Sequence, residues 1–94
     1  MRQEKRHKLQ LFYEILVAID DIIISHEIAK RTHIQHNSRL SYDKMMNHIN
    51  QLEQKGMIHT HRENNNGSIS ITGKGKLFVK RYNELLNLIE SVGL

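Results

Sequence analysis

The chain has 94 residues, with 14 Lys and Arg against 10 Asp and Glu, and its formal net charge is +4 at pH 7. This length allows one small domain, in which a deep two-substrate active site is not expected. The sequence has no cysteine, which excludes a disulfide framework, a Cys-ligated zinc site and thiol catalysis. No apolar run approaches the roughly 20 residues that a membrane helix needs, and no signal peptide is recognisable. We therefore expect a cytoplasmic binding protein rather than an enzyme.

The charge is unevenly distributed along the chain. Residues 1–8 hold four basic side chains against one acidic side chain, whereas residues 9–29 hold four acidic side chains and no Lys or Arg. Residues 30–62 hold six basic side chains against two acidic ones. This asymmetry favours a defined basic face, and a basic face suits a polyanionic partner.

The first predicted element is an amphipathic helix over residues 7–19. Its apolar side chains recur at intervals of three and four, which is the period of one helix face. The residues expected on that face are Leu9, Phe12, Ile15, Leu16 and Ile19. The pattern leaves Ile22–Ile24 open between the end of this helix and a short strand.

A second helix is predicted over about residues 26–36. Ser25 is its candidate N-cap, because a serine hydroxyl can accept a hydrogen bond from a free amide of the first turn. The apolar residues expected to face the core are Ile28, Ala29 and Ile34. Residues 37–39 follow with the chemistry of a turn.

The third predicted helix, over about residues 42–55, has the strongest boundary signals. Ser41 is the best N-cap in the chain, and Leu40 and Met45 have the spacing of a hydrophobic staple. Gly56 suits the position after the helix, where the backbone often becomes left-handed. The side chains expected to face the core are Met45, Met46, Ile49 and Leu52.

A hairpin is predicted over residues 57–71, followed by a last helix over about 74–92. Two short segments flank a polar loop that contains Asn66-Gly67, a dipeptide that favours a tight turn between antiparallel strands. Thr72 can cap the last helix. The apolar residues of this helix are spaced by four and three, as in a heptad seam, and they are Phe78, Tyr82, Leu85, Ile89 and Val92.

This order of elements is that of a winged helix-turn-helix domain, mostly helical with a small β-hairpin. In such a domain the third helix presents its outer face to the major groove of DNA, and the hairpin forms the wing. Asn and Gln suit adenine edges, while Lys suits phosphate or guanine. The residues expected to contact DNA are Arg31, Arg39, Ser41, Tyr42, Lys44, Asn47, His48, Gln51 and Arg62.

Four segments of the chain also resemble one family. They are Lys30-Arg31-Thr32-His33-Ile34, Leu40-Ser41-Tyr42, Leu52-Glu53-Gln54-Lys55-Gly56-Met57-Ile58 and Ile71-Thr72-Gly73-Lys74-Gly75-Lys76. In this order they are similar to the core of the small archaeal winged-helix DNA-binding proteins and regulators, some of which are chromatin-associated. The resemblance covers about residues 30–80.

The resemblance implies a nucleoid-associated homodimer that is joined by an antiparallel coiled coil of the last helix. For this chain, the implied dimer interface is the seam of Phe78, Tyr82, Leu85, Ile89 and Val92. The expected organisation is therefore a DNA-binding domain over residues 1–72 and a dimerisation helix over residues 73–94. We expect double-stranded DNA and a second copy of the chain as partners, with transcription regulation as the function.

Seven histidines suggest two further hypotheses. His59 and His61 point to one side of a predicted strand, and His33 and His36 lie on one side of a predicted helix. No cysteine or carboxylate cluster accompanies them, so we expect no metal site and no cofactor. The other hypothesis is that histidine protonation near about pH 6 adds positive charge and strengthens DNA binding.

The alternative function is a winged helix that contacts another protein of the transcription machinery without reading DNA. An apolar recognition face would favour that function, whereas Lys44, Asn47 and Gln51 favour DNA. The sequence leaves open whether the DNA binding is sequence-specific or architectural.

Overall fold

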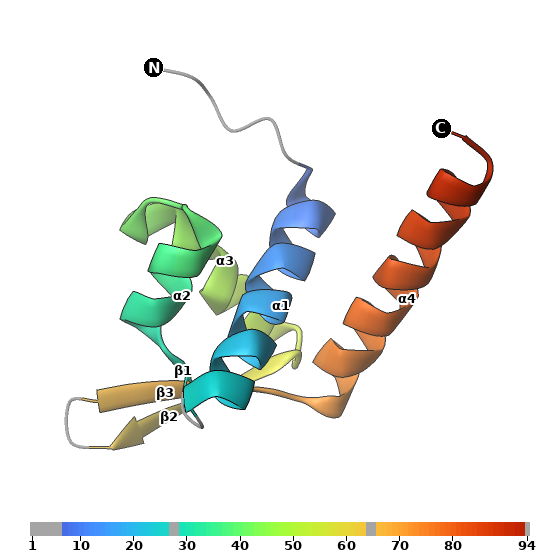
Figure 1. Cartoon of the computed structure of the whole chain (residues 1–94). Coiled ribbons are helices and arrows are strands. Elements are labelled where there is room, and N and C mark those ends of the chain that lie inside the picture. Colours follow the sequence, from blue (N-terminus) through green and yellow to red (C-terminus); the bar gives the residue numbers. More distant parts are fainter. Residues whose placement is uncertain (1–6, 27–28, 64–65, 94) are drawn as a thin grey trace.

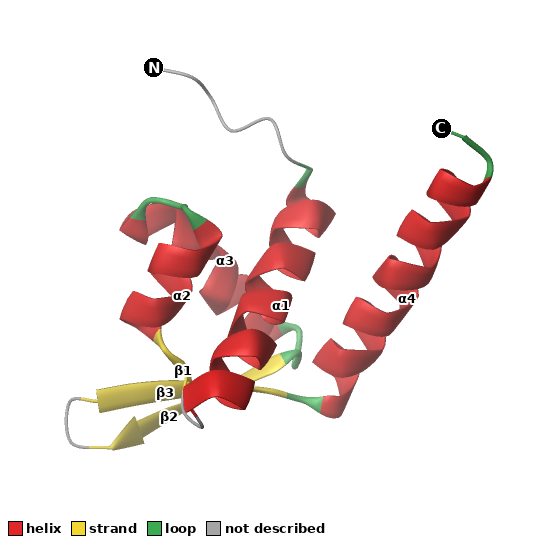
Figure 2. Cartoon of the chain, in the orientation of Figure 1, coloured by secondary structure: helices red, strands yellow, loops and turns green. Residues whose placement is uncertain are grey.

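The computed structural model describes residues 7–26, 29–63 and 66–93. Its elements follow in the order α1 (Lys8–His26), β1 (Ala29–Lys30), α2 (Arg31–Ser38), α3 (Tyr42–Gln54), β2 (Ile58–Glu63), β3 (Asn66–Ile71) and α4 (Gly73–Ser91) (Figure 1). Three helices lie close together above a small sheet, and α4 leaves the sheet on the other side of α1 (Figure 2). The predicted mostly helical winged-helix fold is confirmed. The basic residues 1–6 lie outside the described residues.

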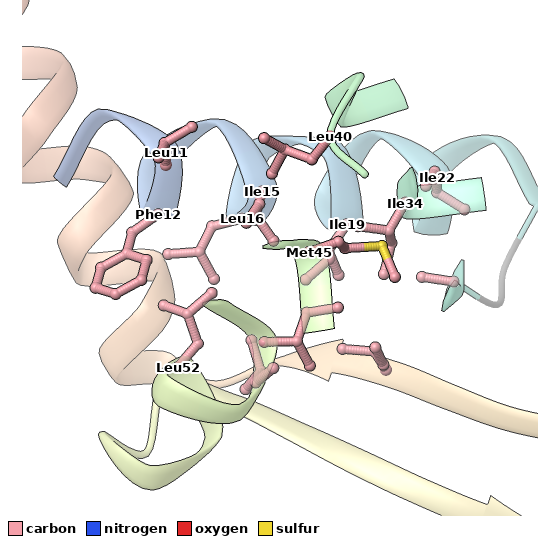
Figure 3. Close-up of a cluster of buried hydrophobic side chains, with 14 residues drawn as sticks. Leu11, Phe12, Ile15, Leu16, Ile19, Ile22, Ile34, Leu40, Met45 and Leu52 are labelled. Atoms are coloured by element: carbon pink, nitrogen blue, oxygen red, sulfur yellow. The ribbon is translucent and has the colours of Figure 1, made fainter. Parts of the chain in front are cut away.

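The first helix is longer than its predicted range of residues 7–19. It continues to His26, so that Ile22–Ile24 is helical and not a strand. Leu9 was expected on the inward face, but its side chain is 46% exposed. Leu9 lies in the first turn of α1, before Leu11 and Phe12, and these two residues form the end of the core cluster (Figure 3). Leu9 is therefore beyond the core.

The predicted second helix begins later than expected. Ala29 and Lys30 form β1 and pair with Ile69 and Ser68 of β3, so that α2 runs only over Arg31–Ser38. Ser25 is therefore not its N-cap but a residue of α1, and the N-cap position is taken by Lys30 without a side-chain hydrogen bond. The prediction for Ile28 falls outside the described residues.

The sheet has three antiparallel strands in the order β1-β3-β2. The predicted hairpin is confirmed, with Ile58 opposite Ile71 at one end and Glu63 opposite Asn66 at the other. Ile58 and Ile69 are buried, so one face of the sheet closes the core. The hairpin is therefore part of the domain where its strands close the core. Beyond that point it extends from the domain as a wing.

One apolar core joins all of these elements. Ile19 of α1, Ile34 of α2 and Met45 of α3 lie together in it, and each is fully buried (Figure 3). Burying a side chain of this size contributes about 1.5–3 kcal/mol relative to exposure. Because the inner face of α3 is held in this core, its outer face has a defined position on the surface.

Candidate nucleic-acid interface

The beginning and the end of α3 are set by local contacts. The Ser41 side chain accepts a hydrogen bond from the backbone amide of Lys44 at 3.4 Å, and the Ser41 carbonyl accepts one from Met45 at 2.9 Å. Leu40 and Met45 are both buried, as a hydrophobic staple requires. After the helix, Gly56 has φ of +75°. The predicted N-cap and the predicted terminating glycine are therefore confirmed.

The outer face of α3 is polar and open. Lys44 and Asn47 are exposed, and Tyr42 is 49% exposed at the beginning of the helix. Gln51 lies one turn after Asn47, and its amide nitrogen donates to the Asn47 side-chain oxygen at 3.4 Å. The two amides therefore lie side by side on a helix face from which Met45 and Ile49 are turned away, because both are buried. Such a face offers donors and acceptors for base edges.

His48 occupies a different position from the rest of the predicted set. Its side chain is half-buried, and its ring meets the ring of Phe12 edge to face, with 5.6 Å between centroids. His48 thus packs toward α1, at the border of the outer face of α3. His48 was predicted to lie on the outer face of the third helix, and its contact with Phe12 of α1 shows the direction of its ring.

Of the three predicted arginines, the structure describes the side chain of Arg39 but not those of the other two. Arg31 is the first residue of α2 and Arg62 lies in β2, and the side chains of both are outside the described part of the structure. Arg39 is exposed and ends α2 with φ of 60°, the left-handed region. Arg39 lines a cleft against α1, and no residue of α3 lines that cleft.

The wing is connected to α3 by side-chain contacts. The Thr60 hydroxyl of β2 donates to the Glu53 carboxylate of α3. On the same strand, the rings of His59 and His61 are 6.1 Å apart, and His61 lies 3.1 Å from the hydroxyl of Ser70. Among the residues that the structure describes, no group of three or more candidate ligands could hold a metal ion.

The first turn of α4 is attached to the end of α3, a feature that sequence reasoning missed. Thr72 caps α4 by accepting from the Gly75 amide at 3.1 Å, and its hydroxyl donates to the Gly56 carbonyl at 2.7 Å. The Lys74 amine donates to the Lys55 carbonyl at 2.6 Å. A Cβ on Gly75 would lie 2.3 Å from the Met57 carbonyl oxygen. The segment Thr72–Gly75 carries the sequence signal for this attachment. From the sequence alone, this segment was interpreted only as the start of a helix.

The residues of the predicted dimer seam lie in two different environments. Tyr82 stacks on Tyr13 of α1 with 4.7 Å between ring centroids, and Phe78 stacks on Tyr82 at 5.8 Å. Both rings are half-buried, as is Ile89. Leu85 and Val92 are instead exposed, and so are Leu77, Leu86 and Leu88. The first half of the seam thus packs within the domain, and the second half does not.

Comparison with known proteins identifies the type of domain. A family model described as winged helix-turn-helix matches residues 5–90. No curated protein matches the sequence. In the described part of the chain, no helix has the length and apolar character to cross a membrane.

Several solved structures share the fold. Sso10a-2, a DNA-binding protein from Sulfolobus solfataricus, has a TM-score of 0.76 and 22% identity, with 93% of this chain and 85% of that chain covered. AF1382 from Archaeoglobus fulgidus has a TM-score of 0.74 and 17% identity, with coverages of 86% and 89%. A MepR variant from S. aureus bound to an oligodeoxyribonucleotide has a TM-score of 0.75 and 15% identity, with coverages of 90% and 67%.

Proposed function

Since this chain belongs to the winged helix-turn-helix family, we propose that it binds double-stranded DNA as a homodimer and regulates transcription. The observation that carries the proposal is the outer face of α3. This face is polar and exposed at Lys44 and Asn47, while the inner face is buried in the core. A helix held in this way can enter the major groove without losing its packing.

The residues of α3 have distinct roles in this proposal. Asn47 and Gln51, whose amides already contact each other, read base edges, and adenine is the base that such amides suit best. Lys44 contacts phosphate or guanine. Tyr42 and Ser41, at the beginning of the helix, contact the sugar-phosphate backbone of the DNA. His48 supports α3 through its contact with Phe12 and reaches DNA only at the edge of the interface.

The arginines lie around this helix and supply charge. Arg31 at the beginning of α2, Arg39 at its end and Arg62 in the wing are the proposed phosphate contacts, from the positions of their backbones. Likeness in fold to a MepR variant bound to an oligodeoxyribonucleotide supports DNA as the partner. No catalytic step is part of the proposed function.

A protein-binding winged helix is the less favoured function. Such a surface would need exposed apolar side chains on the recognition face. Among the described residues of α3, the large exposed apolar side chain is Tyr42, and the other ones lie on α1 and α4. Among the described residues, most of the large exposed apolar side chains are therefore on the helix proposed for dimerisation rather than on the recognition helix.

The exposed apolar side chains along α4 and just after its end support the homodimer. Leu77, Leu85, Leu88 and Val92 are all exposed, and their spacing places them on one side of the helix. This side is turned by about a quarter turn from Phe78 and Tyr82, which pack toward α1. We therefore centre the proposed interface on Leu85, Leu88 and Val92, with Ile89 at its border, and assign Phe78 and Tyr82 to the attachment of α4.

DNA binding is tested by its dependence on salt. A homodimer that contacts about 8 phosphates should show a slope near −7 in log K against log salt concentration on duplex DNA. The Lys44→Gln variant should have a slope shallower by about 2, since a dimer loses two contacts. The matched control is Lys80→Gln on α4, which should leave the slope unchanged. An affinity that does not depend on salt would contradict the proposal.

The homodimer is tested separately by sedimentation equilibrium. We expect a dimer at tens of micromolar, roughly the range that a small apolar interface reaches. The double variant Leu85→Glu with Leu88→Glu should be a folded monomer with weaker DNA binding, because it reaches only one half-site. A monomer of the unmodified chain at these concentrations would overturn the dimer and leave DNA binding to its own test.

A further inference from the structure

A cleft of about 780 Å³ lies between α1 and the turn that joins α2 to α3. Its volume is within the range of about 300–1,000 Å³ that is typical of sites for small molecules. The cleft is lined from α1 by residues of one helix face and from the other side by the end of α2. No residue of α3 lines it, and it shares only Arg39 with the proposed DNA contacts.

The aliphatic part of the cleft lining, here called the floor, consists of Val17 and Ala18 of α1. Ala18 is buried there, at a position where the neighbouring core residues of α1 are Ile, Leu and Phe. A small side chain at this position leaves space between the two helices. Tyr13 forms a wall that is held in place, since its hydroxyl donates to the Asn83 side chain at 3.3 Å and its ring stacks on Tyr82.

The rim carries opposite charges on its two sides. Glu14 and Asp21 come from α1, and Arg39 comes from the end of α2. In the described part of the chain, neither Asp21 nor Arg39 forms an ion pair with another side chain. The rim therefore offers both an anionic group and a cationic group to a molecule in the cleft, above an apolar floor.

The end of α2 fixes the position of Arg39 beside the cleft. The φ of Arg39, 60°, is in the left-handed region, where a glycine or an asparagine is more usual. The Arg39 amide donates to the Gln35 carbonyl at 3.1 Å, so this conformation belongs to the capped end of α2. At this position the side chain of Arg39 reaches the cleft.

We infer that the cleft binds a small zwitterion with a compact apolar body, of the amino-acid class. Its carboxylate pairs with the Arg39 guanidinium, which suits carboxylates by its planar donor geometry. Its ammonium group pairs with Asp21, with Glu14 nearby, and its apolar body rests on Ala18 and against Tyr13.

Such a ligand would also act on DNA binding, and this consequence rests on the proposed function. Arg39 is a proposed phosphate contact, and it lies two residues before Ser41, the N-cap of α3. A carboxylate bound to Arg39 takes this side chain away from the DNA. We therefore expect that the ligand lowers the affinity for duplex DNA.

The experiment is an NMR titration of the full chain, without DNA, with L-phenylalanine as the probe. Saturable amide shifts should gather at residues 13–21 and 36–39. Phenethylamine lacks the carboxylate and 3-phenylpropionate lacks the amine, so each should bind at least about tenfold more weakly. Equal affinity for all three molecules, shifts elsewhere, or no saturation by about 10 mM would overturn the inference.

Variants assign the contacts in the same titration. Arg39→Gln should lower the affinity for L-phenylalanine to that for phenethylamine, and Asp21→Asn should lower it to that for 3-phenylpropionate. The matched controls Lys80→Gln and Asp20→Asn should leave it unchanged. Ala18→Leu should abolish binding by filling the floor, and the two rim variants keep the inference testable if that chain does not fold.

The effect on DNA is measured afterwards with saturating L-phenylalanine. A weaker complex supports the regulatory consequence, and an unchanged affinity overturns that consequence while the site stands on the NMR titration. Failure of the proposed function appears as no DNA binding in the absence of the probe. The two failures are therefore distinguishable.

Discussion

Helices α1 and α4 have the same length of 19 residues and each carries apolar side chains along one face, but they are covered differently. Ile15, Leu16 and Ile19 of α1 are completely buried, whereas Leu88 of α4 and Val92 just after it are 58% and 61% exposed. In Figure 1, α1 lies among the other elements, and the C-terminal half of α4 stands apart from them. The apolar face of a helix therefore does not by itself show whether that face packs against the same chain or against a second copy.

The cause of this difference lies at the two ends of α4. Its first turn is fixed by Thr72, Lys74 and Gly75 against the end of α3. Its middle is held by Tyr82 on Tyr13. Beyond Asn83 the side chains of Leu85, Leu86 and Leu88 are exposed. The helix is thus rigidly joined to the recognition helix at one end and offers apolar side chains at the other.

The largest expected effect is in the covered helix. Ile15→Ala removes a side chain with no exposed surface and should lower the free energy of unfolding by about 2–5 kcal/mol. Urea or guanidinium unfolding followed by circular dichroism measures this loss. Ile24→Ala is the control on the same helix, since Ile24 is 76% exposed, and it should have little effect. Equal losses for both variants would contradict the described packing of α1.

An intermediate effect is expected where α4 begins. Gly75→Ala places a Cβ 2.3 Å from the Met57 carbonyl oxygen and 2.8 Å from Ile71, so it should cost about 1–3 kcal/mol of unfolding free energy. Gly73→Ala is the matched control, because nothing lies within 4 Å of its added Cβ. Thermal or denaturant unfolding compares the two. A Gly75→Ala protein as stable as the control would show that α4 is not attached in this way.

The smallest effect on the protomer is expected in the uncovered half of α4. Leu88→Ala should change the unfolding free energy of the monomer by less than about 0.5 kcal/mol, because the side chain is largely exposed. In the proposed dimer, both copies lose this side chain, so the dissociation constant should rise at least about tenfold. Sedimentation measures this rise, with Asn87→Ala as the control. A loss of protomer stability like that of Ile15→Ala would contradict the comparison of the two helices.

The elements that could be predicted from sequence are those set by neighbouring residues. The third helix was expected over about 42–55 and is found at Tyr42–Gln54, because its cap and its terminating glycine act within one turn. Thr72 caps α4 as expected. By contrast, β1 was missed, since its pairing partner Ile69 lies 40 residues later in the chain. The displaced beginning of α2 follows from the same pairing.

The candidate site likewise has some features that could be predicted from neighbouring residues and others that could not. The period of α3 was enough to predict that Lys44, Asn47 and Gln51 share an outer face, because a helix face depends on spacing alone. The direction of His48 depends on Phe12, and the position of the Arg39 side chain depends on the helix that lies opposite. Neither partner is near in sequence, so neither contact has a local signal.

The sequence by itself determined the fold class, the capped recognition helix, the hairpin and the presence of an apolar seam near the C-terminus. These depend on caps, turns and periodicity, which act over a few residues. The tertiary structure decided which part of that seam the domain itself covers, how α4 is attached to α3, and that Ala18 leaves a cleft beside Arg39. These features arise where distant segments meet, and their geometry is set by the packing of whole helices.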